Sequence, residues 1–333
     1  MAVYGASGAG FAGANLVLAR ALPTEPYALF TLVIALGNLG YSMAPAGLDG
    51  VVNRRHLDAG PALLRGVLRT SILVGLAFAA IGLVAYDMSW PLAAMLFVST
   101  AAGWGWKVLL RERRGTPQGA TTFRWSEALS FAGLSASGLL LVQLERLVIP
   151  HVLPVADLAL YGVLGAIVGS LFRVLQMGVG FSLLPRLRAA GSVQERRRLV
   201  AHEGRLVGTI VVGGSAFIWF LAPVVERWFL AGKYHLAASL VLAAIISGVG
   251  KIANAFTKSI ASALAEPREL SLVNAGGWIS VATSIGGALV GARWGLAGLI
   301  YGVALGWFLR AAFAAVLMVR HLRLPVTIPV TAP

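Results

Sequence analysis

Four positively charged residues fall inside long apolar stretches of the sequence: Arg146, Arg173, Lys251 and Arg310. A charged side chain at the centre of a bilayer costs about 2.5–3.5 kcal/mol on insertion scales, and such residues normally face a polar cavity. Among the acidic residues, Glu145 alone lies clearly inside such a stretch, so internal ion pairs cannot neutralise all four cations. We therefore expect a positively charged interior that attracts an anion. Phosphate suits arginine especially well, because the guanidinium group binds it with two parallel hydrogen bonds.

The sharpest cluster lies in a single apolar stretch near residue 250. Lys251, Asn254 and Lys258 recur at i, i+3 and i+7, which places all three on one face of a helix. The alternative is that Lys258 extends to the membrane surface and that Lys251 is one tolerated charge.

Two further pairs repeat the i, i+3 spacing, namely Gln143 with Arg146 and Arg173 with Gln176. Arg146 lies near the end of its stretch, so an extended side chain at the membrane surface, or an arrangement with Glu145, explains it as well as ligand contact does. The predicted cation-lined site consists of Arg146, Arg173, Gln176, Lys251, Asn254, Lys258 and Arg310.

Other chemistries have little support in the sequence. The five histidines are scattered in or near predicted loops, and the chain has no cysteine. Residues 8–13 read Gly-Ala-Gly-Phe-Ala-Gly and match the dinucleotide-binding fingerprint, but that fingerprint requires a preceding strand. We interpret Gly5, Gly8, Gly10 and Gly13 as small residues for close helix packing in lipid. We expect no enzyme, no cofactor and no metal site.

The elements that must position the cations are long and apolar. The chain has 333 residues, of which 58% are hydrophobic and 12% charged, and its mean hydropathy is +0.82. The apolar residues come in blocks of about 20, which is the length that crosses the hydrocarbon of a bilayer as a helix. We predict an all-α polytopic membrane protein with about ten transmembrane helices, since open sheets cannot satisfy their edges in lipid.

The net charge is +14, and the basic residues lie mostly in the predicted loops. The loops of one side hold most of the arginines and lysines, whereas the other side holds only Arg20, Arg227, Lys233 and Arg293. The positive-inside rule makes the basic side cytoplasmic, so we expect both termini in the cytoplasm and no nucleic-acid partner. The basic segment 111–125 divides the chain into a four-helix lobe, residues 1–125, and a six-helix lobe, residues 126–333.

Three parts of the sequence resemble a known family. They are Leu16–Phe30, with Ala-Arg-Ala-Leu before a short Pro/Glu turn; Ala46–Arg55, with Gly-Leu-Asp before two arginines; and Gln143–Ile149 with Ala159–Val163 and Phe181–Leu187. In these parts the chain resembles the polysaccharide-lipid flippases of the multidrug/oligosaccharidyl-lipid/polysaccharide (MATE-like) exporter superfamily, the O-antigen and teichoic-acid translocases. Glu145 stands where that family commonly has aspartate.

The resemblance implies a MATE-like flippase fold, shortened by two helices in the first lobe, in the bacterial cytoplasmic (inner) membrane. It further implies translocation of a lipid-diphosphate-linked oligosaccharide for polysaccharide biosynthesis, including that of lipopolysaccharide. The two lobes would rock around a cavity that opens alternately to each side. The missing helices leave open a non-transporting or partner-dependent scaffold, and a membrane enzyme of glycan assembly is a further alternative.

The resemblance also gives the polar residues separate roles. Asn254 and Gln176 would hydrogen-bond sugar hydroxyls of the anionic oligosaccharide-lipid. The residues that would attract its diphosphate are Arg173, Lys251, Lys258 and Arg310. Membrane lipids and other polysaccharide-assembly proteins would be the remaining partners.

Overall fold

The computed structural model describes residues 2–48, 61–112, 125–170, 172, 186–187, 189–264 and 267–323. Within these ranges every regular element is a helix and none is a strand, so the prediction of an all-α protein is confirmed. The stretches that are long and apolar enough to cross a membrane are Thr24–Met43, Arg65–Ala85, Val193–Phe229, Ala238–Ala261 and Leu272–His321. The chain therefore has the construction of a helical membrane protein.

The chain folds as two compact units, one formed by residues 1–28 and 152–333 and the other by residues 29–151. These bounds differ from those of the lobes expected at 1–125 and 126–333. The difference has two parts. Helix α1 (Ala2–Ala21) packs against α7 (Val155–Leu164) and the π-helical turn η1 (Gly165–Gly169), and residues 126–151 group with residues 29–125. The first helix thus belongs with the C-terminal helices.

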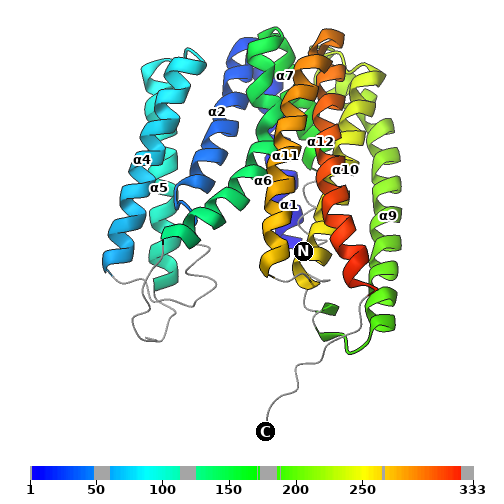
Figure 1. The fold of residues 1–333 in the computed structure, drawn as a ribbon. Coiled ribbons are helices and arrows are strands. Elements are labelled where there is room, and N and C mark those ends of the chain that lie inside the picture. Colours follow the sequence, from blue (N-terminus) through cyan, green and yellow to red (C-terminus); the bar gives the residue numbers. More distant parts are fainter. Residues whose placement is uncertain are drawn as a thin grey trace. The chain divides into compact units, whose positions relative to one another are not determined.

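The unit of residues 29–151 contains most of α2 (Thr24–Met43), together with α4 (Pro61–Ala85), α5 (Trp90–Glu112) and α6 (Trp125–Val152). Helices α4 and α5 pair along their length (Figure 1). Gly47 has φ +79°, and a Cβ there would overlap the backbone oxygen of Ala128 on α6. Only glycine fits this close approach.

The other unit is built on a tightly packed group of C-terminal helices. Its elements after η1 are α9 (Val193–Val224), the π-helical turn η2 (Val225–Phe229), α10 (Ala238–Leu264), α11 (Pro267–Gly291), the 3₁₀ turn η3 (Ala292–Trp294) and α12 (Gly295–His321). Helix α12 packs against both α10 and α11 (Figure 1). Helices α10 and α12 run in the same direction and α11 runs in the opposite one, with α12 lying between α10 and α11.

Small residues hold α11 and α12 together. A Cβ at Gly287 would lie 2.5 Å from the backbone oxygen of Gly302, and the Ser284 hydroxyl donates a hydrogen bond of 3.0 Å to the Val303 carbonyl. Such residues let helices approach closely in lipid. The N-terminal glycines behave differently, because a Cβ at Gly10 or Gly13 meets nothing within 4 Å in the described chain. At Gly10 and Gly13 the predicted close packing is therefore not seen, whereas the hairpin of α11 and α12 is closely packed.

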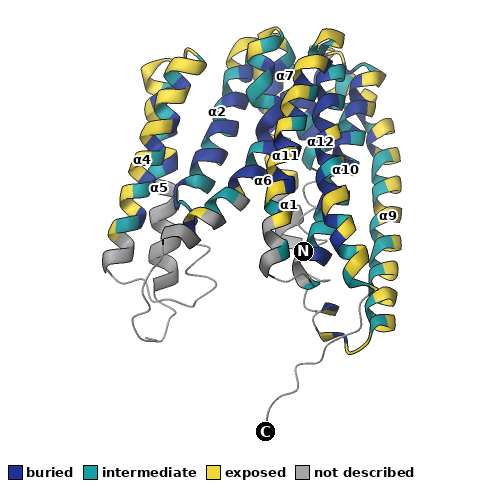
Figure 2. Ribbon diagram, in the orientation of Figure 1, coloured by how far each residue is buried: buried dark blue, intermediate teal, exposed yellow. Residues whose placement is uncertain are grey.

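The outward faces of these helices are apolar. Large side chains such as Val212, Phe220 and Trp228 are exposed on α9 and η2, and Figure 2 shows exposed positions along the length of α9. Contiguous apolar surface of this kind is rare on soluble monomers and indicates contact with lipid or with protein.

Candidate functional site

Helix α10 presents the predicted polar residues to α12. The Nζ atom of Lys251 lies 5.8 Å from the centre of the Trp307 ring on α12. Lys258 follows Lys251 at i+7 on α10, so it lies on the same side of that helix. Both lysines therefore face the same neighbouring helix, and Asn254 lies between them with 5% of its surface exposed.

Helix α12 contributes the facing wall. Trp307 and Arg310 are three residues apart, so they share one side of the helix, and they are only 1% and 2% exposed. Gly250 allows the approach, because a Cβ there would lie 3.1 Å from the Trp307 Cβ. We call Lys251, Asn254, Lys258, Trp307 and Arg310 the α10–α12 cluster.

The α10–α12 cluster is electropositive. Neither α10 nor α12 contains an aspartate or glutamate. Burial lowers the effective dielectric around charges and strengthens the repulsion between Lys258 and Arg310. An anion placed between the two cations would offset that repulsion, so the arrangement favours a negatively charged ligand.

Two buried polar atoms accompany the cations. The Asn254 Oδ1 atom, an acceptor, and the Trp307 Nε1 atom, a donor, have no hydrogen-bond partner among the described residues. A buried polar atom without a partner costs about 1–3 kcal/mol. Ligand groups that both donate and accept, such as hydroxyls, would satisfy these two atoms.

The structure does not gather all the predicted site residues into one group. Arg146 lies on α6, in the unit of residues 29–151, and its Nη1 atom donates to Gln143 Oε1 at 2.8 Å. The contact realises the predicted i, i+3 pair, but it belongs to a different unit from the α10–α12 cluster. Arg173 and Gln176 lie outside the described residues.

Sequence reasoning missed Trp307 and the loop that sets the start of α10. Trp307 is three residues from Arg310, and this i, i+3 spacing was the signal in the sequence.

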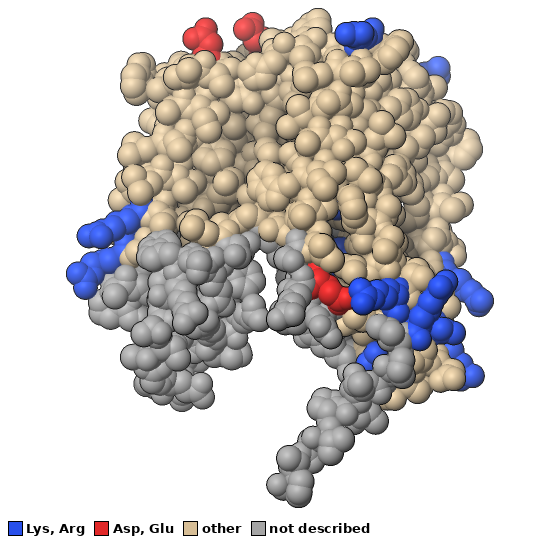
Figure 3. Space-filling view, in the orientation of Figure 1, with Lys and Arg blue, Asp and Glu red and all other residues tan. Residues whose placement is uncertain are grey.

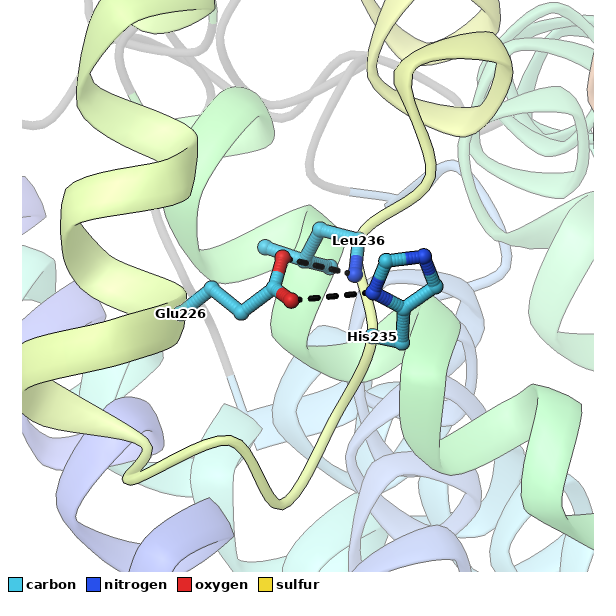
Figure 4. Close-up of polar contacts among 3 residues, drawn as sticks. All are labelled: Glu226, His235 and Leu236. Atoms are coloured by element: carbon cyan, nitrogen blue, oxygen red, sulfur yellow. Dashed lines mark hydrogen bonds and ion pairs between the residues drawn. The ribbon is translucent and has the colours of Figure 1, made fainter.

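In the loop before α10, Glu226 Oε1 lies 3.0 Å from His235 Nδ1, and the Leu236 amide donates to Glu226 Oε2 at 3.0 Å (Figure 4). This clasp fixes the chain two residues before α10 begins.

The same loop is tied to the end of α1. The Lys233 ammonium donates to the Ala19 carbonyl at 2.8 Å and also to the Leu22 carbonyl. The Tyr234 ring lies 6.2 Å from that of Tyr27, and burial raises the pKa of the Tyr234 phenol. The cation satisfies carbonyl groups that the end of the helix leaves open. These contacts tie the loop before α10 to the end of α1.

Comparison with known proteins gives no match. No family model, curated protein or solved structure matches the chain. The resemblance to polysaccharide-lipid flippases therefore remains a prediction from short sequence motifs.

Proposed function

We propose that this protein translocates a lipid-diphosphate-linked oligosaccharide across the bacterial cytoplasmic membrane, as a shortened MATE-like flippase of about ten helices. The observation that carries the proposal is the α10–α12 cluster, in which Lys251, Lys258 and Arg310 lie within two helices that have no acidic residue. A diphosphate is negatively charged and is attracted by these cations. The lipid tail would remain in the bilayer while the head group occupies the polar interior.

The polar atoms of the cluster fit the remainder of such a ligand. Sugar hydroxyls can donate to Asn254 Oδ1 and accept from Trp307 Nε1, the two buried atoms without a described partner. Lys251 over the Trp307 ring is held by a cation–π contact, which keeps the ammonium group at mid-helix. Arg173 and Gln176 remain proposed members of the site on the sequence alone.

Transport is favoured over catalysis by the types of residue in the cluster. An intramembrane enzyme acting on a phosphate usually needs a carboxylate, a histidine or a metal beside the bond to be broken. The α10–α12 cluster offers cations, an amide and an indole. We therefore assign it a binding role, with lipid-linked oligosaccharide as the partner.

The distribution of charge supports a cytoplasmic position for the α12 end. Within the unit of residues 1–28 and 152–333, cations concentrate where α9 begins and α12 ends, as Figure 3 shows. The described members are Arg186, Arg196, Arg197, Arg198, Arg205, Arg320 and Arg323. By the positive-inside rule this end faces the cytoplasm.

Reconstitution of the whole protein in vesicles tests the proposal. A fluorescent lipid-diphosphate oligosaccharide is placed in both leaflets, and a membrane-impermeant quencher measures exchange between them, with and without ion gradients. We expect exchange with wild type and at least about tenfold slower exchange with Lys251→Gln, equivalent to 1.4 kcal/mol. Arg293→Gln is the control, since Arg293 is exposed at the opposite end of α12. Binding without exchange would favour the scaffold alternative, and hydrolysis of the lipid would favour the enzyme.

A further inference from the structure

Helix α9 is longer than a bilayer requires. Together with η2 it forms one continuous helix, Val193–Phe229, of 37 residues. That length is about 55 Å, whereas the hydrocarbon layer measures about 30 Å. Residues 206–225 carry no charged side chain, and the arginines of α9 all lie before them. The first turns of α9 therefore extend beyond the apolar layer.

This basic extension is firmly structured. It begins at Ser192, whose hydroxyl accepts a hydrogen bond of 3.1 Å from the Glu195 amide, while Glu195 Oε2 accepts one of 3.0 Å from the Gly191 amide. Reciprocal bonds of this type are a strong start signal for a helix. The arginines that follow consequently keep fixed positions around the helix.

The apolar side of the extension is turned inward. Leu199 and Val200 pack against buried Leu187 and Ile260, together with Met318 of α12. Arg197, Arg198 and Arg205 are exposed. Packing buries Leu199 and Val200 in part and leaves these three arginines exposed at the surface.

The end of α12 adds to the same surface. Arg197 Nε donates to the Leu322 carbonyl at 2.9 Å, which brings the extension beside exposed Arg320 and Arg323. We call Arg186, Arg197, Arg198, Arg205, Arg320 and Arg323 the basic surface; Figure 3 shows cations gathered there.

Acidic residues offset little of this charge. Glu203 pairs with Arg186 at 3.1 Å, and Glu269 pairs with Arg320 at 3.3 Å. His321 Nε2 also lies 2.6 Å from Glu269, so that carboxylate is shared. Both glutamate side chains are 13% exposed, which leaves arginine as the dominant charge presented to the surroundings.

We propose that the basic surface binds the headgroups of anionic phospholipids in the cytoplasmic leaflet and selects them over zwitterionic ones. Along one helix, Arg205 is followed directly by exposed apolar residues beginning with Leu206 and Ile210. A phospholipid has the matching order, with an anionic phosphate above two acyl chains. Clusters of basic residues beside a membrane-spanning helix attract such lipids. This inference stands independently of the proposed transport.

Lipid selectivity in a reconstituted bilayer tests the inference. Whole protein is reconstituted with spin-labelled phosphatidylglycerol or phosphatidylcholine, and electron spin resonance measures the fraction of each lipid immobilised on the protein. At low salt we expect wild type to prefer phosphatidylglycerol by about threefold or more. The triple variant Arg197→Gln, Arg198→Gln, Arg205→Gln should reduce that preference close to one, while the control Arg227→Gln, Arg293→Gln should keep it.

Two comparisons separate lipid from other anions. Inorganic phosphate should reduce the preference no more than chloride of equal ionic strength, because the acyl chains contribute to binding. A larger effect of phosphate would identify a site for free anions and would overturn the proposal. Equal immobilisation of the two lipids by wild type, or unchanged selectivity in the correctly folded triple variant, would also overturn it.

Discussion

Helices α9 and α10 follow one another in the chain, and both are long and apolar, but they carry their positive charges differently. Within an 18-residue apolar window of the helix that contains α9, 11% of the residues are buried inside the protein, against 56% in such a window of α10. Helix α9 holds its arginines before the apolar stretch, whereas α10 holds Lys251 near its middle, against Trp307. In these two helices, the cation in the middle of an apolar span lies where a neighbouring helix packs against it.

Adding a cation in the middle of α9 should give the largest effect. Val212 is exposed, so Val212→Arg would place a guanidinium group against lipid at a cost of about 2.5–3.5 kcal/mol. We expect a marked loss of membrane-inserted protein, measured by protease protection and yield. Ala201→Arg, on the exposed basic extension, is the control. Equal insertion of the two variants would contradict the contrast between the helices.

The second effect concerns the like charges of the α10–α12 cluster. Lys258→Met removes the repulsion with Arg310, so the ligand-free protein should become more stable by about 1 kcal/mol, as replacement of buried charge by apolar groups often does. Binding of a lipid diphosphate should weaken about tenfold, which corresponds to 1.4 kcal/mol. Thermal unfolding and ligand titration measure the two changes. A variant that loses stability and keeps its affinity would show that Lys258 has a structural role only.

The aromatic partner of Lys251 should have a smaller effect. Trp307→Leu removes a cation–π contact worth about 0.5–2 kcal/mol, and Trp307→Phe should retain part of it. Unfolding temperatures should therefore fall in the order tryptophan, phenylalanine, leucine. Repeating the series with Lys251→Met isolates the pair, because the electrostatic part of the difference should then disappear. A series that is unchanged in that background would exclude the contact.

The smallest effect is expected at the clasp before α10. His235 is exposed, so its pair with Glu226 is worth about 0–1 kcal/mol. Glu226→Gln should speed amide hydrogen exchange in residues 230–237 while changing global stability little. Glu195→Gln, at the start of α9, is a matched control that should leave this loop unaffected. Unaltered exchange in Glu226→Gln would show that Lys233 and Tyr234 hold the loop without the clasp.

The sequence was informative where a property belongs to one helix. The period of 3.6 residues placed Lys251, Asn254 and Lys258 on one face, and Lys251 does face Trp307 on α12. Apolar block length likewise predicted the all-α class. These inferences need no knowledge of neighbouring helices.

Properties shared between helices were not accessible in the same way. Glycines mark a capacity for close packing without naming the partner, which is why Gly10 and Gly13 are open while Gly287 meets Gly302. Trp307 became part of the site only because α12 lies beside α10, opposite Gly250. Residue spacing also could not show that Arg146 and Lys251 belong to different compact units.

Ligand affinity measures whether the α10–α12 cluster attracts a diphosphate. Purified whole protein is titrated with a short-chain lipid-diphosphate sugar and with the corresponding neutral lipid-linked sugar. Electrostatic attraction by the α10–α12 cluster predicts binding of the diphosphate at least about tenfold tighter, or 1.4 kcal/mol, and loss of that preference in Arg310→Gln but not in Arg293→Gln. Equal affinity of wild type for the charged and neutral ligands would contradict the account.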